Sequence, residues 1–424
     1  MTKMKLKIPF SPPDMSEEEA KEVRDAILSG WITTGPRTKK LEAQISEYVG
    51  TVKAVCLSSA TAAMEMMLHL LDVQPEDEVI VPAYTYTATA SVTQHVGCRL
   101  VMVDSQKDHV EMDYEQLEQA ITEKTKVIMP VDIAGIVADY DRVYEIVERK
   151  KNLFRPANAL QAKIGRIVVA ADCAHAFGAV RKGKMAGAIA DFSAFSFHAV
   201  KNFTTAEGGA LTWKLPFGTE IVPTDVDYMP TVPKIEDETW NEMLYRISQL
   251  FSLHGQNKDA LAKTKVGMWE YDIIGPWYKC NMTDIMASLG LVQMRRYPKM
   301  LERRQEIVAR YNAALDGLNV TVLNHKDAEH CSSHHLYMVR LPGKSREEVN
   351  RVMEQMAERG IATNVHFKQL PMMTAYKALG FHIADYPNAY RLFENEITLP
   401  LYTRLTDEEV DYVITNFVDI IKNL

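Results

Sequence analysis

Residues 165–210 read GRIVVAADCAHAFGAVRKGKMAGAIADFSAFSFHAVKNFTTAEGGA. The apolar run 167–171, rich in β-branched residues, predicts a buried strand of a parallel sheet, and Asp172 follows it directly. A second predicted strand, 192–197, carries Ser196 and leads to His198 and Lys201. In open α/β sheets, ligands bind at the carboxyl ends of the strands, so we expect these polar side chains to share one site.

Lys201 is the side chain in this stretch that carries reactive chemistry. A lone lysine after a strand is usually a solvated cation, but here Asn-Phe-Thr-Thr follows, with polar groups able to reach an anion. Gly208 and Gly209 allow close backbone approach. A lysine in a partly apolar pocket has a lowered pKa and can form a Schiff base with an aldehyde. Pyridoxal 5'-phosphate (PLP) is the aldehyde that also needs an acid opposite its ring nitrogen, which indicates PLP held by Lys201 and Asp172.

The segments ADCAHAFGA and SFHAVKNFTTAEGG resemble those of the DegT/DnrJ/EryC1/StrS family of PLP-dependent sugar aminotransferases, and the resemblance extends over nearly the whole chain. It implies an α/β fold of PLP-dependent fold type I, like aspartate aminotransferase. That fold has a mostly parallel central sheet and a smaller C-terminal α+β domain. Two positions depart from the family pattern, since Ala60 and Ala206 stand where many relatives have glycine.

The resemblance also assigns roles to residues outside the opening stretch. It places the cofactor phosphate on Ala60 and Thr61 at a predicted helix start, together with Ser196; a plain serine N-cap is the simpler reading of that helix start. His175 would contact the phenolic oxygen of the cofactor or support Asp172. Further residues implied are Tyr86 stacking on the pyridine ring, Asn281 reaching the phosphate of a neighbouring subunit, and Thr33, Thr34, Lys279 and His366 near the substrate.

Strand–helix alternation along the first part of the chain predicts a doubly wound large domain over 1–275, with an acidic, proline-containing insertion around 214–236. Residues 276–424, beginning near a long predicted helix, form the predicted C-terminal domain. Two weaker candidates remain: Asp132 at a strand end, and Arg340 as a contact for a nucleotide diphosphate. No GxGxxG or GxxxxGK[ST] motif supports a nicotinamide or P-loop site.

Composition narrows the classes of partner. The 424 residues carry a net charge of −8 with no basic block, which argues against nucleic acid or an anionic membrane surface. Five scattered cysteines without CxxC spacing predict no metal site and suggest a reducing cytoplasm. Neither a signal peptide nor an apolar run of transmembrane length is found.

The function that the resemblance implies is amino transfer from L-glutamate to a 4-keto-6-deoxy sugar linked to UDP or dTDP. Bacterial surface polysaccharide or glycan synthesis is the implied setting, and a homodimer with shared active sites is the implied assembly. The alternatives are a sugar dehydratase of the same fold, in which histidine replaces the lysine, and a non-catalytic regulator. The presence of Lys201 and Asp172 favours the transaminase.

Overall fold

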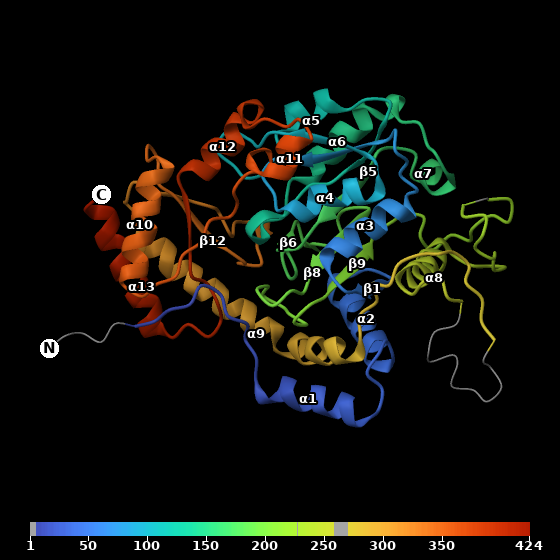
Figure 1. The fold of residues 1–424 in the computed structure, drawn as a ribbon, viewed down its shortest axis with the longest axis horizontal. Helices are drawn as coiled ribbons and strands as arrows, with labels where there is room; N and C mark the ends of the chain where they lie inside the picture. Colours follow the sequence, from blue (N-terminus) through green and yellow to red (C-terminus); the bar gives the residue numbers. More distant parts are fainter. Residues whose placement is uncertain (1–5, 227, 258–269) are drawn as a thin grey trace.

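This computed structural model describes residues 6–226, 228–257 and 270–424, which contain a seven-stranded central sheet (Figure 1). The strand order is β1-β9-β8-β5-β4-β2-β3, and only β9 runs antiparallel to its neighbours within this sheet. The predicted mostly parallel sheet is therefore confirmed. The strands are β1 (Ala54–Leu57), β2 (Glu78–Pro82), β3 (Arg99–Val103), β4 (Thr125–Ile128), β5 (Val168–Asp172), β8 (Phe192–Ser196) and β9 (Gly209–Trp213).

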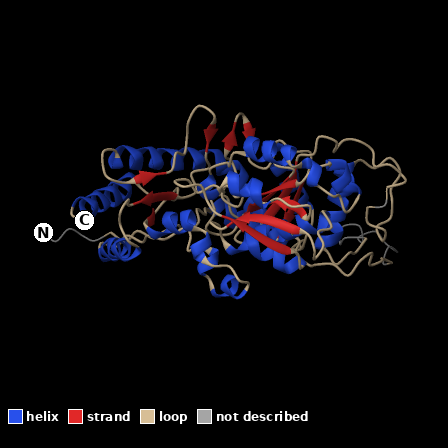
Figure 2. Cartoon of the chain, turned by 90° about the horizontal axis from the view of Figure 1, so that it is seen from above, coloured by secondary structure: helices blue, strands red, loops and turns tan. Residues whose placement is uncertain are grey.

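Both faces of the central sheet are buried, which explains its continuous apolar strands. Along β5, Val168 and Ala170 belong to one hydrophobic cluster, whereas Val169 and Ala171 belong to another on the opposite face. Helices flank the strands in the view from above (Figure 2). The helices of this part of the chain are α2 (Pro36–Val49), α3 (Ala60–Leu70), α4 (Thr87–Val96), α5 (Tyr114–Ala120), α6 (Tyr140–Arg149), α7 (Ala159–Ile164) and α8 (Trp240–Ser252).

The long helix α9 (Asp284–Leu315) connects the central sheet to the C-terminal part, and α1 (Glu17–Leu28) packs along it (Figure 1). Thr283 caps α9, as its hydroxyl accepts a hydrogen bond from the backbone N–H of Met286. A three-stranded antiparallel sheet follows, formed by β10 (Thr321–Val322), β12 (Tyr337–Arg340) and β13 (Glu396–Leu399). The helices of the C-terminal part are α10 (Arg346–Glu358), α11 (Thr374–Ala378), α12 (Pro387–Glu394) and α13 (Asp407–Lys422).

The beginning of the described chain joins this C-terminal part. Ile8 pairs with Ile361 and is buried in the same hydrophobic cluster as Ile307 of α9. The chain then runs toward the central sheet, so residues 10 and 11 lie between the two parts. The division at residues 275 and 276 stays a prediction.

The remaining elements are short. A third small sheet contains β6 (Val180–Arg181), β7 (Lys184–Met185) and β11 (His330–Cys331), and the 3₁₀ helices are η1 (Ile133–Gly135), η2 (Lys151–Leu153), η4 (Leu370–Met372) and η5 (Ile383–Asp385). Within 214–236, Tyr228 is buried and donates a hydrogen bond to the carbonyl of Leu70, so the segment packs against α3; Asp227 lies outside the described residues. No helix in the described ranges is long and apolar enough to cross a membrane.

Candidate active site

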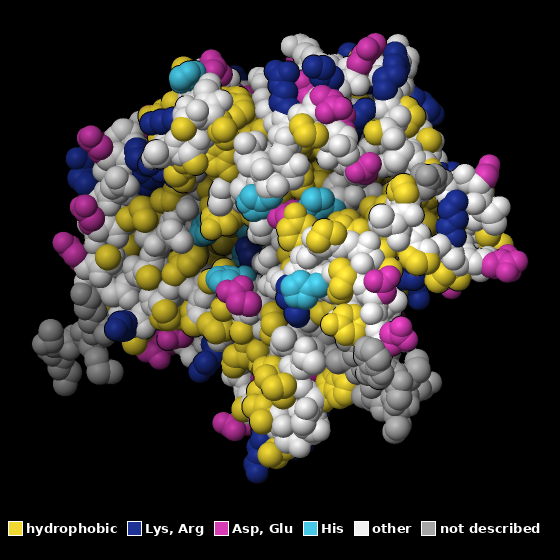
Figure 3. Space-filling view, turned by 45° about the vertical axis from the view of Figure 1, so that its right-hand side comes forward, with side chains coloured by type: hydrophobic (Ala, Val, Ile, Leu, Met, Phe, Trp, Pro, Cys, Tyr) yellow, Lys and Arg dark blue, Asp and Glu magenta, His cyan; other side chains and the backbone are white. Residues whose placement is uncertain are grey.

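A cavity of about 700 Å³ opens at the carboxyl ends of β5 and β8. Its walls come from the starts of α3 and α4, from the segment that follows β8, and from the C-terminal part at residues 335–336 and 364–367. Figure 3 shows histidine side chains gathered around a hollow in one face of the molecule. Histidines 175, 198, 335 and 366 line the cavity.

Asp172 ends β5 inside this cavity and is 4% exposed. Its Oδ2 accepts a hydrogen bond from the hydroxyl of Thr89 at 2.7 Å, and its Oδ1 accepts one from the backbone N–H of Ala174 at 3.0 Å. Burial raises the pKa of Asp172, whereas these hydrogen bonds and the charge of Lys201 lower it. The two donors fix the orientation of the carboxyl group, so it can hold a proton on a ring nitrogen facing it.

Lys201 lies in the turn after β8, where its backbone N–H bonds to the carbonyl of His198 at 2.9 Å. Burial lowers the pKa of its amine to about 8, and the charge of Asp172 opposes this shift. At pH 7 about a tenth of the amine is therefore uncharged, far more than for an ordinary lysine, and the uncharged form is the one that attacks an aldehyde.

The start of α3 forms a candidate phosphate site. Ser59 caps the helix through the backbone N–H of Ala62 at 3.0 Å, and Ser59, Ala60 and Thr61 line the cavity with Ser196 and Gly208. The next residue, Gly209, lets the backbone of β9 approach the start of α3 closely, because a Cβ there would lie only 2.5 Å from the backbone nitrogen of Ala60. Helix N–H groups, hydroxyls and close backbone approach together suit a phosphate group.

His175 and Tyr86 provide rings on the cavity wall. The backbone N–H of Ala134 donates to Nδ1 of His175 at 3.3 Å, so the neutral ring carries its proton on Nε2. Burial and the charge of Lys201 lower the pKa of His175 well below its ordinary value. Tyr86 is 60% exposed and lies 5.8 Å from Phe367 between ring centroids, which leaves its face available for stacking.

Several wall residues have no signal in the motifs. Phe10 stacks on His366 at 5.6 Å, and His335 lies 4.4 Å from His175 between ring centroids. The amide nitrogen of Asn202 donates to the carbonyl of Ser333, which fixes the orientation of the amide. Its Oδ1 therefore accepts a hydrogen bond from Nδ1–H of His335 at 2.9 Å. These residues come from distant parts of the chain, and only an alignment of relatives would mark them from sequence.

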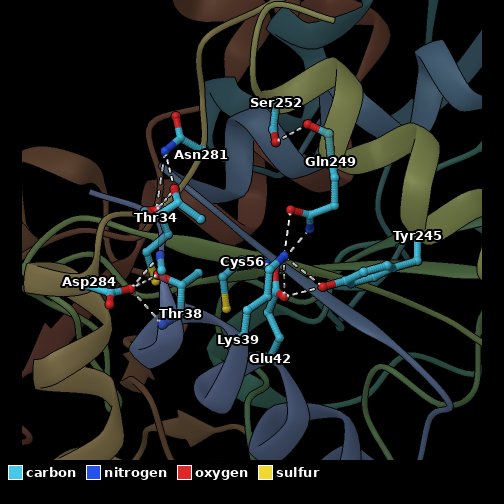
Figure 4. Close-up of polar contacts among 12 residues, drawn as sticks. Thr34, Thr38, Lys39, Glu42, Cys56, Tyr245, Gln249, Ser252, Asn281 and Asp284 are labelled. Atoms are coloured by element: carbon cyan, nitrogen blue, oxygen red, sulfur yellow. Dashed lines mark hydrogen bonds and ion pairs between the residues drawn. The ribbon is translucent and has the colours of Figure 1, made fainter. Parts of the chain in front are cut away.

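The remaining predicted residues lie outside this cavity, and Figure 4 shows two of them, Thr34 and Asn281. Thr34 donates to the carbonyl of Met282 at 2.6 Å and accepts a hydrogen bond from Asn281, which in turn accepts one from Lys279. Thr33 and Lys279 are exposed. We call Thr33, Thr34, Lys279 and Asn281 the 34–281 cluster; it lines no wall of the cavity formed by its own chain.

Asp284, which the motifs do not single out, anchors the loop of this cluster and is fully buried (Figure 4). Its carboxylate accepts hydrogen bonds from the backbone N–H groups of Gly35, Arg37 and Thr38 at 2.9–3.0 Å, and from the Thr38 hydroxyl at 2.8 Å. The first residue of α9 therefore holds the start of α2, and with it the loop that contains Thr33 and Thr34.

Two weaker candidates lie away from the cavity walls. Asp132 is fully buried, accepts hydrogen bonds from the Tyr140 hydroxyl and the Ala138 N–H, and has a pKa raised to about 7 by burial. Arg340 lies beside Asp108 at 3.9 Å and lines a smaller hollow. In the described ranges, no group of histidine, cysteine, aspartate and glutamate side chains could hold a metal ion.

The cavity fits PLP on its chemistry. A lysine amine with a lowered pKa suits the aldehyde, a fixed carboxyl group suits the ring nitrogen, and the start of α3 suits the phosphate.

Comparisons with known proteins agree with the cofactor. The sequence profile of the DegT/DnrJ/EryC1/StrS aminotransferase family matches residues 13–418. A putative sugar aminotransferase from Streptococcus pneumoniae, Spr1654, solved in PLP and PMP forms, is 54% identical with a TM-score of 0.89. Its PLP form is matched over 99% of both chains.

Two curated relatives match over nearly their full length. The uncharacterised protein MJ1066 of Methanocaldococcus jannaschii is 36% identical over 96% of each chain. The spore coat polysaccharide biosynthesis protein SpsC of Bacillus subtilis is 33% identical over 98% of this chain and 97% of its own. The chain therefore belongs to the DegT/DnrJ/EryC1/StrS aminotransferase family and is a PLP-dependent sugar aminotransferase.

Proposed function

We propose that this enzyme transfers the amino group of L-glutamate to the keto group of a 4-keto-6-deoxy sugar linked to UDP or dTDP. The observation that carries the proposal is the meeting of Lys201, Asp172 and the start of α3 in one cavity of about 700 Å³. Such a volume is typical of sites for small molecules. The similarity to SpsC supports a role in bacterial surface polysaccharide or glycan synthesis, and the cytoplasm is the proposed location.

Each predicted residue has a defined part in this proposal. PLP, when bound, supplies an electron sink that lets the carbon bearing the amino group lose a proton. Lys201 holds the cofactor and, when its amine is free, moves that proton at Nζ. Asp172, oriented by Thr89, keeps the ring nitrogen protonated. Ala60, Thr61 and Ser196 hold the phosphate, while Tyr86 and His175 contact the ring and its phenolic oxygen.

The 34–281 cluster completes the active site of a partner subunit in this proposal. Leu28 and Ile32, close in the chain to Thr33 and Thr34, are 72% and 50% exposed, and a partner would cover these apolar side chains. Lys201 is the only lysine or arginine among the described residues that line the cavity. A nucleotide diphosphate needs further positive charge, and Lys279 of a second subunit would supply it. Asn281 would reach the cofactor phosphate from the same side.

A panel of UDP- and dTDP-linked keto-sugars with L-glutamate tests the proposed substrates, scored by the mass of the aminated product. The Lys201→Ala variant should lose about 10²–10⁴-fold in rate, because it removes the group that moves the proton. Lys182→Ala is the control; this exposed lysine pairs with Asp141, and its variant should keep the wild-type rate. Amination by Lys201→Ala at the wild-type rate, or no product from any keto-sugar, would contradict the proposal.

A further inference from the structure

A fully buried carboxyl group in the C-terminal part is connected to the cavity by hydrogen bonds. Glu396, the first residue of β13, is 0% exposed. Its Oε2 accepts the backbone N–H of His366 at 3.0 Å, and its Oε1 accepts the hydroxyl of Thr398. The same hydroxyl oxygen lies 2.9 Å from Nδ1 of His366, whose ring lines the cavity. These contacts connect Glu396 through Thr398 to His366.

The direction of these hydrogen bonds follows from counting protons, because a hydroxyl group carries a single hydrogen. When Glu396 is ionised, Thr398 donates to it, so Thr398 must accept from Nδ1–H of His366. Nε2 of His366 then presents a lone pair. When Glu396 is protonated, it can donate to Thr398, which then donates to Nδ1. The proton of the neutral ring is then on Nε2.

Both states of Glu396 are accessible near neutral pH. Burial raises the pKa of its carboxyl group to about 8, and the nearby guanidinium of Arg346 on α10 opposes the shift. Tyr84 donates to the carbonyl of His366, and Arg340 on β12, Asp108 and His109 line the same small hollow as Glu396. On the cavity side, Lys201, His175 and His335 face His366. Burial and the charge of Lys201 lower the pKa of His366 to about 3, so its ring passes a proton on rather than keeping a charge.

We propose that Glu396, Thr398 and His366 form a relay that carries one proton between the buried carboxyl group and the cavity, with Nε2 of His366 as its outlet. A proton that arrives at Nε2 lets Nδ1 pass its own proton to Thr398, whose hydroxyl proton moves to Oε1 of Glu396. The reverse movement returns one proton to the cavity. Glu396 and Thr398 are positioning residues, because they act through His366.

The use of this relay rests on the proposed function. Amination of a keto group exchanges oxygen for nitrogen and releases water, so the departing oxygen must gain protons that the nitrogen loses. The relay can lend its proton to the oxygen and regain one from the nitrogen, which leaves no net consumption. Lys201 is then free to move the proton on carbon.

Selective ¹⁵N labelling of histidine tests the relay without substrate or donor. The His366 signals, assigned by their loss in His366→Gln, should report the Nε2–H ring below about pH 8 and the Nδ1–H ring above it. Glu396→Gln should abolish this transition. A single tautomer of His366 from pH 6 to 10 in the wild type, or an unchanged transition in Glu396→Gln, would overturn the relay. Because Lys201 titrates in the same range, the NMR signal isolates the relay better than a rate–pH profile does.

Kinetics supply the second test. Thr398→Val removes the relaying hydroxyl and should lower kcat about a hundredfold with little change in KM or in the visible absorption of bound PLP. Thr398→Ser should restore kcat. Thr93→Val is the matched control, because Thr93 is equally buried and its hydroxyl has hydrogen bonds to residues of α4. Equal kcat for Thr398→Val and Thr93→Val would overturn the relay. A wild-type protein that shows no NMR transition would do the same, and neither result would contradict the proposed substrates.

Discussion

The amine of Lys201 is subject to two opposing effects, and their balance can be measured. Burial lowers its pKa to about 8, while the charge of Asp172 acts in the other direction. Only the unprotonated amine attacks the aldehyde of PLP, so the rate at which PLP is incorporated into the cofactor-free enzyme should rise with pH through a midpoint near 8. An ordinary lysine would give a midpoint near 10.4.

The variant Asp172→Asn separates the two effects. It removes the negative charge that favours the ammonium form, so the midpoint for incorporation should move below that of the wild type. Incorporation is followed by borohydride reduction and mass measurement, with Lys182→Ala as a control that keeps the wild-type midpoint. An unchanged midpoint in Asp172→Asn would mean that the two charges do not interact.

The residues that the sequence pattern predicts well are those at strand ends. Asp172, Ser196 and Lys201 could be placed in one cavity from sequence because the buried strands before them fix which edge of the sheet they reach. Phe10, His335 and Glu396 could not be predicted in this way. Their positions depend on packing between segments that are not neighbours in the chain, and no local periodicity encodes that packing.

At the scale of the element, the segment 362–370 shows why a strand-like sequence pattern can mislead. The run ATNVHFKQL predicts a strand, but after Ile361 it pairs only at Asn364, opposite Thr398. The backbone N–H of His366 donates to the carboxyl group of Glu396 instead of to a strand carbonyl. A side-chain carboxyl group therefore takes the place of the backbone carbonyl of a neighbouring strand, and the strand does not continue.

The junction between α9 and the loop before α2 gives a prediction about an element. Asp284→Ala should lower the free energy of unfolding by about 2–4 kcal/mol, because it leaves several buried N–H groups without their acceptor. Urea denaturation measures this change. Asp316→Ala, an exposed acid just after the end of the same helix, should change stability by less than about 0.5 kcal/mol. Equal effects of the two variants would refute the anchoring role of Asp284.

For the whole molecule, buried histidines predict sensitivity to acid. Burial lowers the pKa of His325 to about 3 and that of His334 to about 4, and their rings stack at 5.4 Å. In the unfolded chain both would protonate near pH 6.5. The unfolded state therefore binds more protons below that pH, and stability should fall as the pH drops from about 6.5 toward 4. At pH 5 the loss is about 2 kcal/mol for each histidine.

Chemical denaturation at pH 7 and pH 5 measures this loss. The variant His325→Asn keeps a polar group near Ser332 but cannot take up a proton, so the difference between the two pH values should shrink by about 2 kcal/mol. His382→Gln replaces an exposed histidine and should leave the difference unchanged. A wild-type protein equally stable at both pH values would show that these rings stay accessible to protons when folded.

The proposed shared active site can be tested by mixing subunits. Lys201→Ala removes the lysine from a chain's own cavity, whereas a combined Thr34→Ala and Asn281→Ala variant damages only what that chain offers to its partner. In a mixed dimer, one cavity carries both defects and the other carries neither. Random reassociation of equal amounts makes half of the dimers mixed, so about a quarter of the wild-type activity should return although each variant alone is inactive. If each cavity is completed by its own chain, every cavity in the mixture retains a defect and no activity returns.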